Sequence, residues 1–390
     1  MLTTSSVTGR FSFPTSVVFG PGVLAGAGPD VQRLGRRALI VTDADLAPGP
    51  VVARVAAMLE AAGLRAAVFG GVHPNPTESD VREGLRALQE HDADLLVAVG
   101  GGSPLDAAKL IRLVQHHPFP ITDYDARGGG DARVTGPLAA LVAVPTTSGT
   151  GSEVSRSAVV SLDADGRKLV VFSPRLIPTL AICDPELTVG LPPRLTAATG
   201  ADALTHGVEA YLARGFHPPA DALALQAVAY AFRYLRRAVM EPGDLEARTY
   251  MMLASMLGAM AFQKGLGACH AMAHSLTAVH HVHHGLANAL CLPAVVEANA
   301  AAVPERVREL DRAAGNSLAL LSNEAAVEHF CGELRGLFFD TGLPLSLRAA
   351  GIEPDYGRLV PLALADGCLN DNPLDFSAAQ IEALYRQTAE

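Results

Sequence analysis

Short apolar runs alternate with amphipathic segments along the first half of the chain. The apolar runs predict buried strands at 36–43, 64–72, 94–103 and the start of 138–153. The segments between them have helical periodicity, and they predict helices at 51–63, 78–93 and 104–115. Strands that alternate with helices form parallel sheets that helices cover on both faces. The first half is therefore predicted to be an α/β domain with a parallel sheet.

The pattern changes near residue 190. From there on the chain consists of long segments rich in alanine and leucine with helical periodicity, such as 220–239 and 245–262, and strand-like runs are few. Prolines cluster at 184–193, which indicates a boundary. We expect two domains, an α/β domain at 1–190 and an all-helical domain at 191–390.

Composition and charge narrow the class of protein. A hydrophobic content of 49% with 18% charged residues is typical of a compact folded protein. The net charge of −10, with arginine pairs only at 36–37 and 236–237, argues against a nucleic-acid partner. No apolar run approaches the roughly 20 residues of a membrane span, so we expect no membrane partner. Five dispersed cysteines without a CxxC motif, and no basic leader followed by an apolar core, predict a cytoplasmic protein.

Candidate metal donors occur as two pairs with the same spacing. Asp202 and His206 are four residues apart, as are His270 and His274. In a helix, each pair would lie on one face within reach of one ion. Carboxylate and neutral imidazole suit a borderline divalent cation such as iron(II) or zinc. A packed or solvated HxxxH pair on an alanine-rich helix is the alternative interpretation of either pair alone.

His284 can join the same ion only if the chain turns. In an unbroken helix the fourteen positions from His270 would separate the two histidines by roughly 20 Å. The run VHHVHHG, which ends at Gly285, is the expected place for a turn. The zinc-protease motif HExxH is excluded, because Ala271 stands where that motif needs its glutamate.

Two glycine-rich and hydroxyl-rich loops follow predicted strands. Gly101, Gly102 and Ser103 come at the end of a strand, and a helix begins at once. Glycines let the backbone approach an anion, and a helix N-terminus offers unpaired N–H groups, so this loop predicts a pyrophosphate site; a plain glycine turn is the alternative. The second loop, PTTSGTGSEVS, adds further hydroxyl groups at the same edge, where open parallel sheets bind ligands.

Asp43 closes the first predicted strand. Its carboxylate could accept hydrogen bonds from the ribose hydroxyls of an adenosine, and it would repel a 2′-phosphate. This position favours NAD over NADP. An ordinary capping aspartate is an equally good interpretation from position alone.

Four segments in this order resemble the iron-containing alcohol dehydrogenase family (group III): GGGSPLDAAK, PTTSGTGSEVS, GADALTHGVEAY and HAMAHSLTAVHHVHHGLANA. The resemblance covers nearly the whole chain. It implies an α/β dinucleotide domain, a helical metal domain and NAD-dependent hydride transfer between a primary alcohol and an aldehyde. Iron(II) is the metal that the family implies, although the donors suit zinc equally well.

The resemblance also assigns roles to residues. It implies that the metal ligands are Asp202, His206, His270 and His284, and that His274 lies beside the metal and moves protons. It implies that the dinucleotide is held by Asn75, Gly101, Gly102, Ser103, Asp106, Thr146, Thr147, Thr150 and Lys168, and Ser155, where many relatives have threonine, belongs to this set.

Lys264 departs from the family pattern, since many relatives carry an asparagine-rich turn there. Its ammonium could pair with an anionic substrate tail, which would favour an ω-hydroxy acid and its semialdehyde; a solvated lysine is the alternative. Two other functions share some of these features. A lyase of the dehydroquinate synthase type also uses NAD and a metal, and a non-catalytic metal- or nucleotide-binding protein would need no His274. The β-branched and aromatic segment RFSFPTSVVFG predicts a strand through which a homodimer could form.

Overall fold

The computed structural model describes residues 13, 15–164, 166–316 and 322–390. The chain divides into two compact units. The α/β unit comprises Pro14–Thr147 and Gly151–Gly190, and the helical unit contains Ser148–Thr150 and Leu191–Glu390.

A six-stranded parallel sheet forms the centre of the α/β unit, with the strand order β1-β8-β5-β4-β2-β3. Its strands are β1 (Ser16–Phe19), β2 (Arg37–Asp43), β3 (Arg65–Val72), β4 (Leu95–Gly100), β5 (Ala140–Pro145) and β8 (Leu180–Cys183). Strands β6 (Ser157–Ser161) and β7 (Lys168–Phe172) form a separate antiparallel hairpin. The sheet confirms the predicted α/β class; the hairpin and β8 were not predicted.

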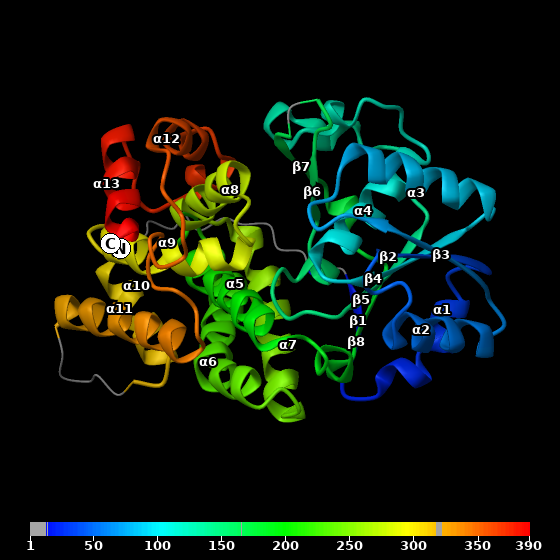
Figure 1. Ribbon diagram of the computed structural model, residues 1–390, viewed down its shortest axis with the longest axis horizontal. Coiled ribbons are helices and arrows are strands. Elements are labelled where there is room, and N and C mark those ends of the chain that lie inside the picture. Colours follow the sequence, from blue (N-terminus) through cyan, green and yellow to red (C-terminus); the bar gives the residue numbers. More distant parts are fainter. Residues whose placement is uncertain (1–12, 14, 165, 317–321) are drawn as a thin grey trace. The chain divides into compact units, whose positions relative to one another are not determined.

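Both faces of the sheet are buried because β4 and β5 are apolar along their length and β2 is apolar from Ala38 to Val41. On β2, Ala38 and Ile40 belong to one core cluster, and Leu39 and Val41 belong to the other. Helices α1 (Gly28–Gln32) and α2 (Pro50–Ala61) cover the first face, and α3 (Glu78–Glu90) and α4 (Gly102–Val114) cover the second (Figure 1). This arrangement explains the unbroken hydrophobic runs from which the strands were predicted.

In its described residues, the second unit has helices joined by turns and loops and no strand, as predicted. Its helices are α5 (Pro193–Leu212), α6 (Pro218–Met240), α7 (Leu245–Ala261), α8 (Ala268–His280), α9 (His284–Asn299), α10 (Pro304–Ala313), α11 (Asn323–Asp340), α12 (Tyr356–Leu364) and α13 (Ala378–Ala389). Its core is one continuous apolar cluster to which α5, α8 and α9 all contribute. These three helices carry the predicted metal donors.

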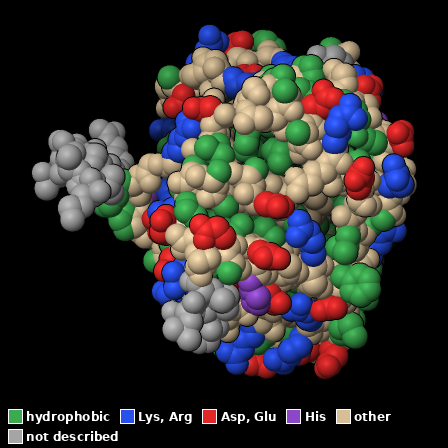
Figure 2. Space-filling view, turned by 90° about the vertical axis from the view of Figure 1, so that its left-hand side faces the viewer, with side chains coloured by type: hydrophobic (Ala, Val, Ile, Leu, Met, Phe, Trp, Pro, Cys, Tyr) green, Lys and Arg blue, Asp and Glu red, His purple; other side chains and the backbone are tan. Residues whose placement is uncertain are grey.

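The surface mixes charges of both signs. On the face shown in Figure 2, acidic and basic side chains are interspersed among hydrophobic ones. Among the described residues, no helix combines the length and the apolar character that crossing a membrane would require.

Candidate functional site

Helix α5 presents the first pair of candidate ligands. Asp202 and His206 are one turn apart on this helix, which is buried along almost its whole length. The Nε2 atom of His206 lies 3.9 Å from Oδ1 of Asp202, and both side chains are less than 10% exposed. The spacing of four residues therefore places both donors on one face, as predicted.

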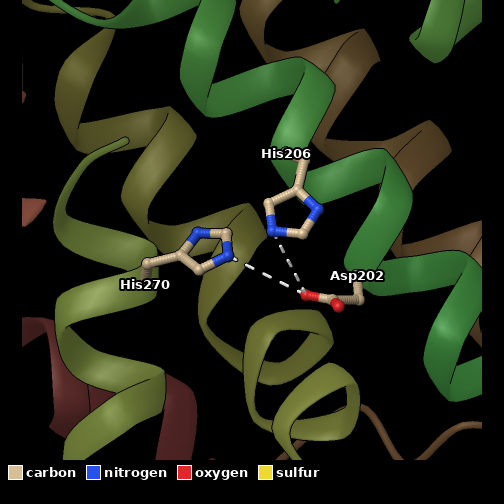
Figure 3. Close-up of side chains that lie close together, drawn as sticks. All are labelled: Asp202, His206 and His270. Atoms are coloured by element: carbon tan, nitrogen blue, oxygen red, sulfur yellow. Dashed lines mark ion pairs between the residues drawn. The ribbon is translucent and has the colours of Figure 1, made fainter. Parts of the chain in front are cut away.

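Helices α8 and α9 bring two more imidazoles to the same carboxylate. Helix α8 ends at His280, His281 adopts a left-handed conformation with φ of 55°, and α9 begins at His284. This reversal confirms the predicted turn. The Nε2 atoms of His270 and His284 lie 3.8 Å and 3.4 Å from Oδ1 of Asp202. Figure 3 shows the rings of His206 and His270 directed at Asp202 from two different helices.

Gly285 explains how α9 reaches this position. A Cβ atom on this residue would lie 2.0 Å from the carbonyl oxygen of Ala198 on α5 and 3.2 Å from Cβ of Asp202. Only glycine therefore allows the first turn of α9 to pack against α5. The neighbouring His284 is consequently held beside Asp202.

The donor set fits a divalent metal. Three imidazoles and one carboxylate are ligands that iron(II) and zinc both accept. The Nδ1 atom of His270 lies 2.5 Å from Oε2 of Glu209, and Glu209 also accepts hydrogen bonds from the backbone N–H groups of Cys269 and His270. A carboxylate at Nδ1 keeps the proton there and leaves the lone pair of Nε2 directed toward Asp202, which is the arrangement that metal-binding histidines use.

Asn288 also lies among the ligand atoms. Its buried Nδ2 atom is 2.7 Å from Oδ1 of Asp202, 3.3 Å from Nε2 of His270 and 3.2 Å from Nε2 of His284. The amide thus contacts three of the four predicted ligands. It fixes their spacing within the core of the helical unit.

The surroundings shift the pKa values of His206 and His270 in opposite directions. Burial lowers the pKa of His206 to about 4, against the opposing charge of Asp202. Burial also acts to lower the pKa of His270, but the hydrogen bond and charge of Glu209, with the charge of Asp202, outweigh it and raise this pKa. His206 is therefore neutral near pH 7 and able to bind a metal, while the two carboxylates supply negative charge for the ion.

His274 lies beside the ligands. Its ring stacks on that of His284 with centroids 5.2 Å apart, and its Nδ1 is 2.9 Å from Oδ2 of Asp366. Burial would raise the pKa of Asp366, but the charge and hydrogen bond of His274, with the backbone N–H of Cys368, hold it well below its usual range. The imidazole is therefore oriented by an ionised carboxylate, which suits a group that accepts or passes on protons.

The predicted dinucleotide residues of the α/β unit gather at the carboxyl ends of the strands. Helix α4 begins directly after β4, and its N-cap, Gly101, has no side chain to cap the helix. A Cβ on Gly101 would lie 3.3 Å from the side chain of Thr147, so the two loops are neighbours. Ser103 Oγ donates to the carbonyl of Pro74, next to the exposed Asn75. The free N–H groups of α4 thus lie where open parallel sheets bind phosphates.

The other predicted dinucleotide residues differ in their surroundings. Asp43 Oδ1 accepts hydrogen bonds from the backbone N–H groups of Asp45 and Leu46, as a capping aspartate does. Burial lowers the pKa of Lys168, which opens β7, to about 8. The Oγ of buried Ser155 is 2.8 Å from that of Ser157. Thr146 is buried after β5, whereas Thr150 groups with the helical unit.

Asp106 belongs to a hydrogen-bond network within the α/β unit. Its two oxygens accept from Ser152 Oγ at 2.6 Å and from the backbone N–H of Val159 at 3.0 Å. The buried Lys109 donates to Ser152 Oγ and lies 3.8 Å from the Asp106 carboxylate. The structure therefore gives Asp106 partners that join α4 to the loop after β5 and to β6.

The surroundings of Lys264 do not agree with its predicted role, which was to pair with an anionic substrate tail. Its Nζ donates to Oδ1 of Asp221 at 2.6 Å and to the carbonyl of Tyr211 at 3.0 Å, and its side chain is 1% exposed. Arg306 pairs with the same carboxylate oxygen. The ammonium thus forms a buried ion pair that joins α6 to the short 3₁₀ helix η9 (Phe262–Lys264) after α7, and it is not presented to a substrate.

Three residues of the site were missed from the sequence. Glu209 lies seven positions after Asp202, two turns along the same helix face, so periodicity could have found it. Asn288 lies one turn after His284 on α9, so helical periodicity could have found it as well. Asp366 precedes the short 3₁₀ helix η10 (Gly367–Asp371). No pattern in the sequence indicated its contact with α8, because no spacing rule links the two segments.

A carboxylate and three imidazoles in one unit, and a helix N-terminus at a strand end in the other, are the features expected of a metal-dependent enzyme that uses a dinucleotide. Comparison with known proteins makes this specific. The model of iron-containing alcohol dehydrogenases matches residues 14–185, and that of the C-terminal part of the same family matches 196–389. The chain belongs to the iron-containing alcohol dehydrogenase family.

Individual relatives agree with the family. A 4-hydroxybutyrate dehydrogenase from Cupriavidus necator is 43% identical over 92% of this chain and 94% of its own length. A crystal structure of 1,3-propanediol oxidoreductase has a TM-score of 0.94 and 39% identity, covering 97% of this chain and all of the other. A sulfoacetaldehyde reductase from Bifidobacterium kashiwanohense, solved with NAD+, has a TM-score of 0.86 and 27% identity, covering 98% of each chain.

The chain is therefore an NAD-dependent alcohol dehydrogenase or aldehyde reductase of the iron type. The lyase and the non-catalytic protein that the sequence left open are not supported by these matches.

Proposed function

We propose that the helical unit binds the catalytic metal through Asp202, His206, His270 and His284, and that the reaction interconverts a primary alcohol and an aldehyde. The observation that carries this proposal is the convergence of three imidazole Nε2 atoms on one carboxylate oxygen. A bound iron(II) or zinc ion would supply Lewis-acid polarisation of the alcohol or carbonyl oxygen. Hydride transfer is the chemistry that the nicotinamide supplies.

His274 is the proposed proton-transfer group. Asp366 holds its Nδ1, so Nε2 is left to exchange a proton with the substrate oxygen or with solvent. The side chain is 24% exposed, which permits this exchange. The proposed ligand His284 beside it is similarly exposed, at 27%, whereas the ligand His270 is 2% exposed.

In the α/β unit, we propose that the first turn of α4, with Gly101, Gly102 and Ser103, holds the pyrophosphate of NAD. The other dinucleotide residues in this proposal are Asp43, Asn75, Asp106, Thr146, Thr147, Thr150, Ser155 and Lys168. Asp43 is the residue expected to exclude a 2′-phosphate.

Replacement of one ligand tests the metal assignment. His270→Ala is expected to lose bound metal and NAD-linked activity together, since only three of the four proposed donors remain and the buried Glu209 loses its imidazole partner. Metal content and NADH oxidation are measured on the same preparation. The control is His116→Ala, which removes an exposed histidine of the α/β unit. Full activity in metal-free His270→Ala would contradict the assignment.

We further infer that ω-hydroxy acids are the substrate class. The inference is supported by the relative from Cupriavidus necator, whose name gives 4-hydroxybutyrate as its substrate. With NAD, kcat/KM for 4-hydroxybutyrate is expected to exceed that for 1,3-propanediol at least tenfold, and equal values would contradict the inference.

Lys264→Met tests whether the buried ion pair takes part in this preference. The ratio of the two kcat/KM values is expected to stay unchanged, because the Lys264 ammonium is paired with Asp221. Stability is expected to fall by about 1–3 kcal/mol, since Asp221 loses a partner. A selective loss of activity toward 4-hydroxybutyrate would restore the substrate-binding role of Lys264.

We also propose that the enzyme is a cytoplasmic homodimer. All five cysteines are free in the structure, which suits a reducing compartment. Strand β1 is an edge strand of the six-stranded sheet, and an edge offers unpaired backbone groups for association. The rest of the predicted dimer segment, residues 10–12 and 14, lies outside the described residues. Light scattering that gives a monomer mass would contradict the dimer.

A further inference from the structure

A second group of metal-type donors lies next to the proposed catalytic ligands. The side chains of His274, Asp366 and Cys368 each place one donor atom within 4.8 Å of the other two. His274 belongs to α8, and the other two flank Gly367 at the start of η10. None of the three is a ligand in the catalytic set, so this is a separate cluster.

The donors match a thiophilic divalent cation. Zinc bonds to imidazole nitrogen, carboxylate oxygen and thiolate sulfur at about 2.0–2.3 Å, so ligand atoms around a tetrahedral ion are roughly 3.3–3.6 Å apart. His274 Nδ1 and Asp366 Oδ2 are 2.9 Å apart. Admitting an ion between them requires these two atoms to separate by a few tenths of an ångström, which flexible side chains permit. Water would complete the coordination.

The cluster is reachable from solvent. The side chains of His274 and Asp366 are 24% and 22% exposed. All five cysteines lie in the described part of the chain, and four of them are buried, whereas Cys368 is partly exposed. Cys368 is thus the thiol that an incoming ion can meet. The backbone N–H of Cys368 donates to Oδ1 of Asp366 at 2.9 Å, which fixes both donors on the same turn.

We propose that His274, Asp366 and Cys368 form a second, inhibitory binding site for zinc-like divalent cations. An ion bound there occupies Nδ1 of His274 and the thiolate of Cys368, and it displaces the hydrogen bond of His274 to Asp366. The Cys368 thiol proton passes to solvent, and the remaining ring proton of His274 lies on Nε2. With a metal on Nδ1 and a proton on Nε2, the imidazole has no lone pair with which to accept a proton, so turnover falls while the catalytic metal stays in place. The inhibitory effect rests on the proposed role of His274, whereas binding of the ion does not.

Cobalt(II) gives a direct test of binding. The catalytic set has only nitrogen and oxygen donors, so cobalt there produces no sulfur-to-cobalt charge transfer. Enzyme whose catalytic site is already filled is titrated with further cobalt(II), and a near-ultraviolet sulfur-to-cobalt band is expected to grow with the binding of one additional ion per chain. Cys368→Ser is expected to lose this band. Cys331→Ala, which removes a buried thiol on α11, is the control and is expected to keep it.

Zinc titration of the iron-loaded enzyme tests the effect on turnover. Wild-type activity is expected to fall at least tenfold while the iron content stays constant, and Cys368→Ser is expected to keep both its iron and its activity. Loss of iron in parallel with activity would assign the inhibition to metal exchange and contradict the regulatory part of the proposal.

The second metal site and the proposed dehydrogenase function are contradicted by different results. Absence of the charge-transfer band in the wild type, or its survival in Cys368→Ser, overturns the second site whatever the activity. A protein that shows the band but has no dehydrogenase activity in any metal form would retain the site and overturn the proposed function.

Discussion

Glu209 orients His270, a proposed metal ligand, through its contacts with the imidazole and with the first turn of α8. Its two oxygens receive the Nδ1 of His270 and two backbone N–H groups from the first turn of α8. It therefore acts on the direction of the Nε2 lone pair and on the position of α8 together. Carboxylates behind a metal-bound histidine raise the basicity of the ligand and fix its ring.

We predict that Glu209→Gln weakens metal affinity by about 10- to 100-fold, because the amide keeps the shape but loses the charge that supports His270. Competition with a chromogenic chelator measures this affinity. The matched control is Glu246→Gln, an exposed residue on α7, which is expected to leave the affinity unchanged. Equal affinities for wild type and Glu209→Gln would show that the Glu209 charge is not needed.

Glu153 makes the stability of the α/β unit depend on pH. This residue is 2% exposed in the 3₁₀ turn η6 (Ser152–Val154), and burial raises its pKa to about 7. The folded-state pKa is above the unfolded value of about 4.3, so the folded state binds the proton more tightly. The resulting stabilisation is complete below pH 4.3 and is lost as the pH rises to 7.

Glu153→Gln is predicted to remove this dependence. Between pH 4.5 and 7.5 the wild type is expected to lose on the order of 3 kcal/mol relative to the variant, from the size of the pKa shift. Denaturant unfolding of both proteins at several pH values measures the difference. Glu60→Gln, an exposed position on α2, is the control. If the free energy of unfolding changed with pH in the same way for wild type and Glu153→Gln, the raised pKa of Glu153 would be contradicted.

At the level of helices, the packing of α9 against α5 determines the position of His284. The Cβ that Gly285 lacks would lie 2.0 Å from a backbone oxygen, and backbone atoms cannot move aside as a side-chain end can. We predict that Gly285→Ala lowers the free energy of unfolding by about 1–3 kcal/mol and reduces metal affinity, because α9 must shift away from α5.

The control for this prediction is Gly332→Ala within α11, where nothing lies within 4 Å of the added Cβ. It is expected to gain about 0.5–1 kcal/mol from helix propensity alone. Thermal unfolding and metal binding are measured for both variants. Similar stability for the two variants would contradict the close approach of α9 to α5.

The sequence was sufficient to predict helices, strands and short residue spacings. It was not sufficient to predict contacts between residues far apart in the chain. Strands β2 to β5 and the helices that carry Asp202 and His270 followed from periodicity, because each depends on residues close together in the chain. The pairing of Lys264 with Asp221 spans 43 positions, and its sequence context gave no sign of it. The pairing of His274 with Asp366 spans 92 positions and was likewise invisible. The short β8 and the β6–β7 hairpin had too few residues for a clear period.

For the whole molecule, the proposed function divides the reaction between the two units. The proposed dinucleotide loops lie in the α/β unit, and the proposed metal ligands lie with His274 in the helical unit. The family models match the two parts of the chain separately, at 14–185 and 196–389. The proposed function needs both parts for one turnover, so NAD binding alone or metal binding alone does not establish it.

The most direct test is NADH oxidation with succinate semialdehyde by enzyme stripped with a chelator and reloaded anaerobically with iron(II) or zinc. Turnover is predicted to vanish on stripping and to return with the working metal, while NAD binding persists throughout, because the α/β unit does not supply the metal ligands. Turnover by the stripped enzyme, or its absence with both metals despite NAD binding, would contradict a metal-dependent dehydrogenase.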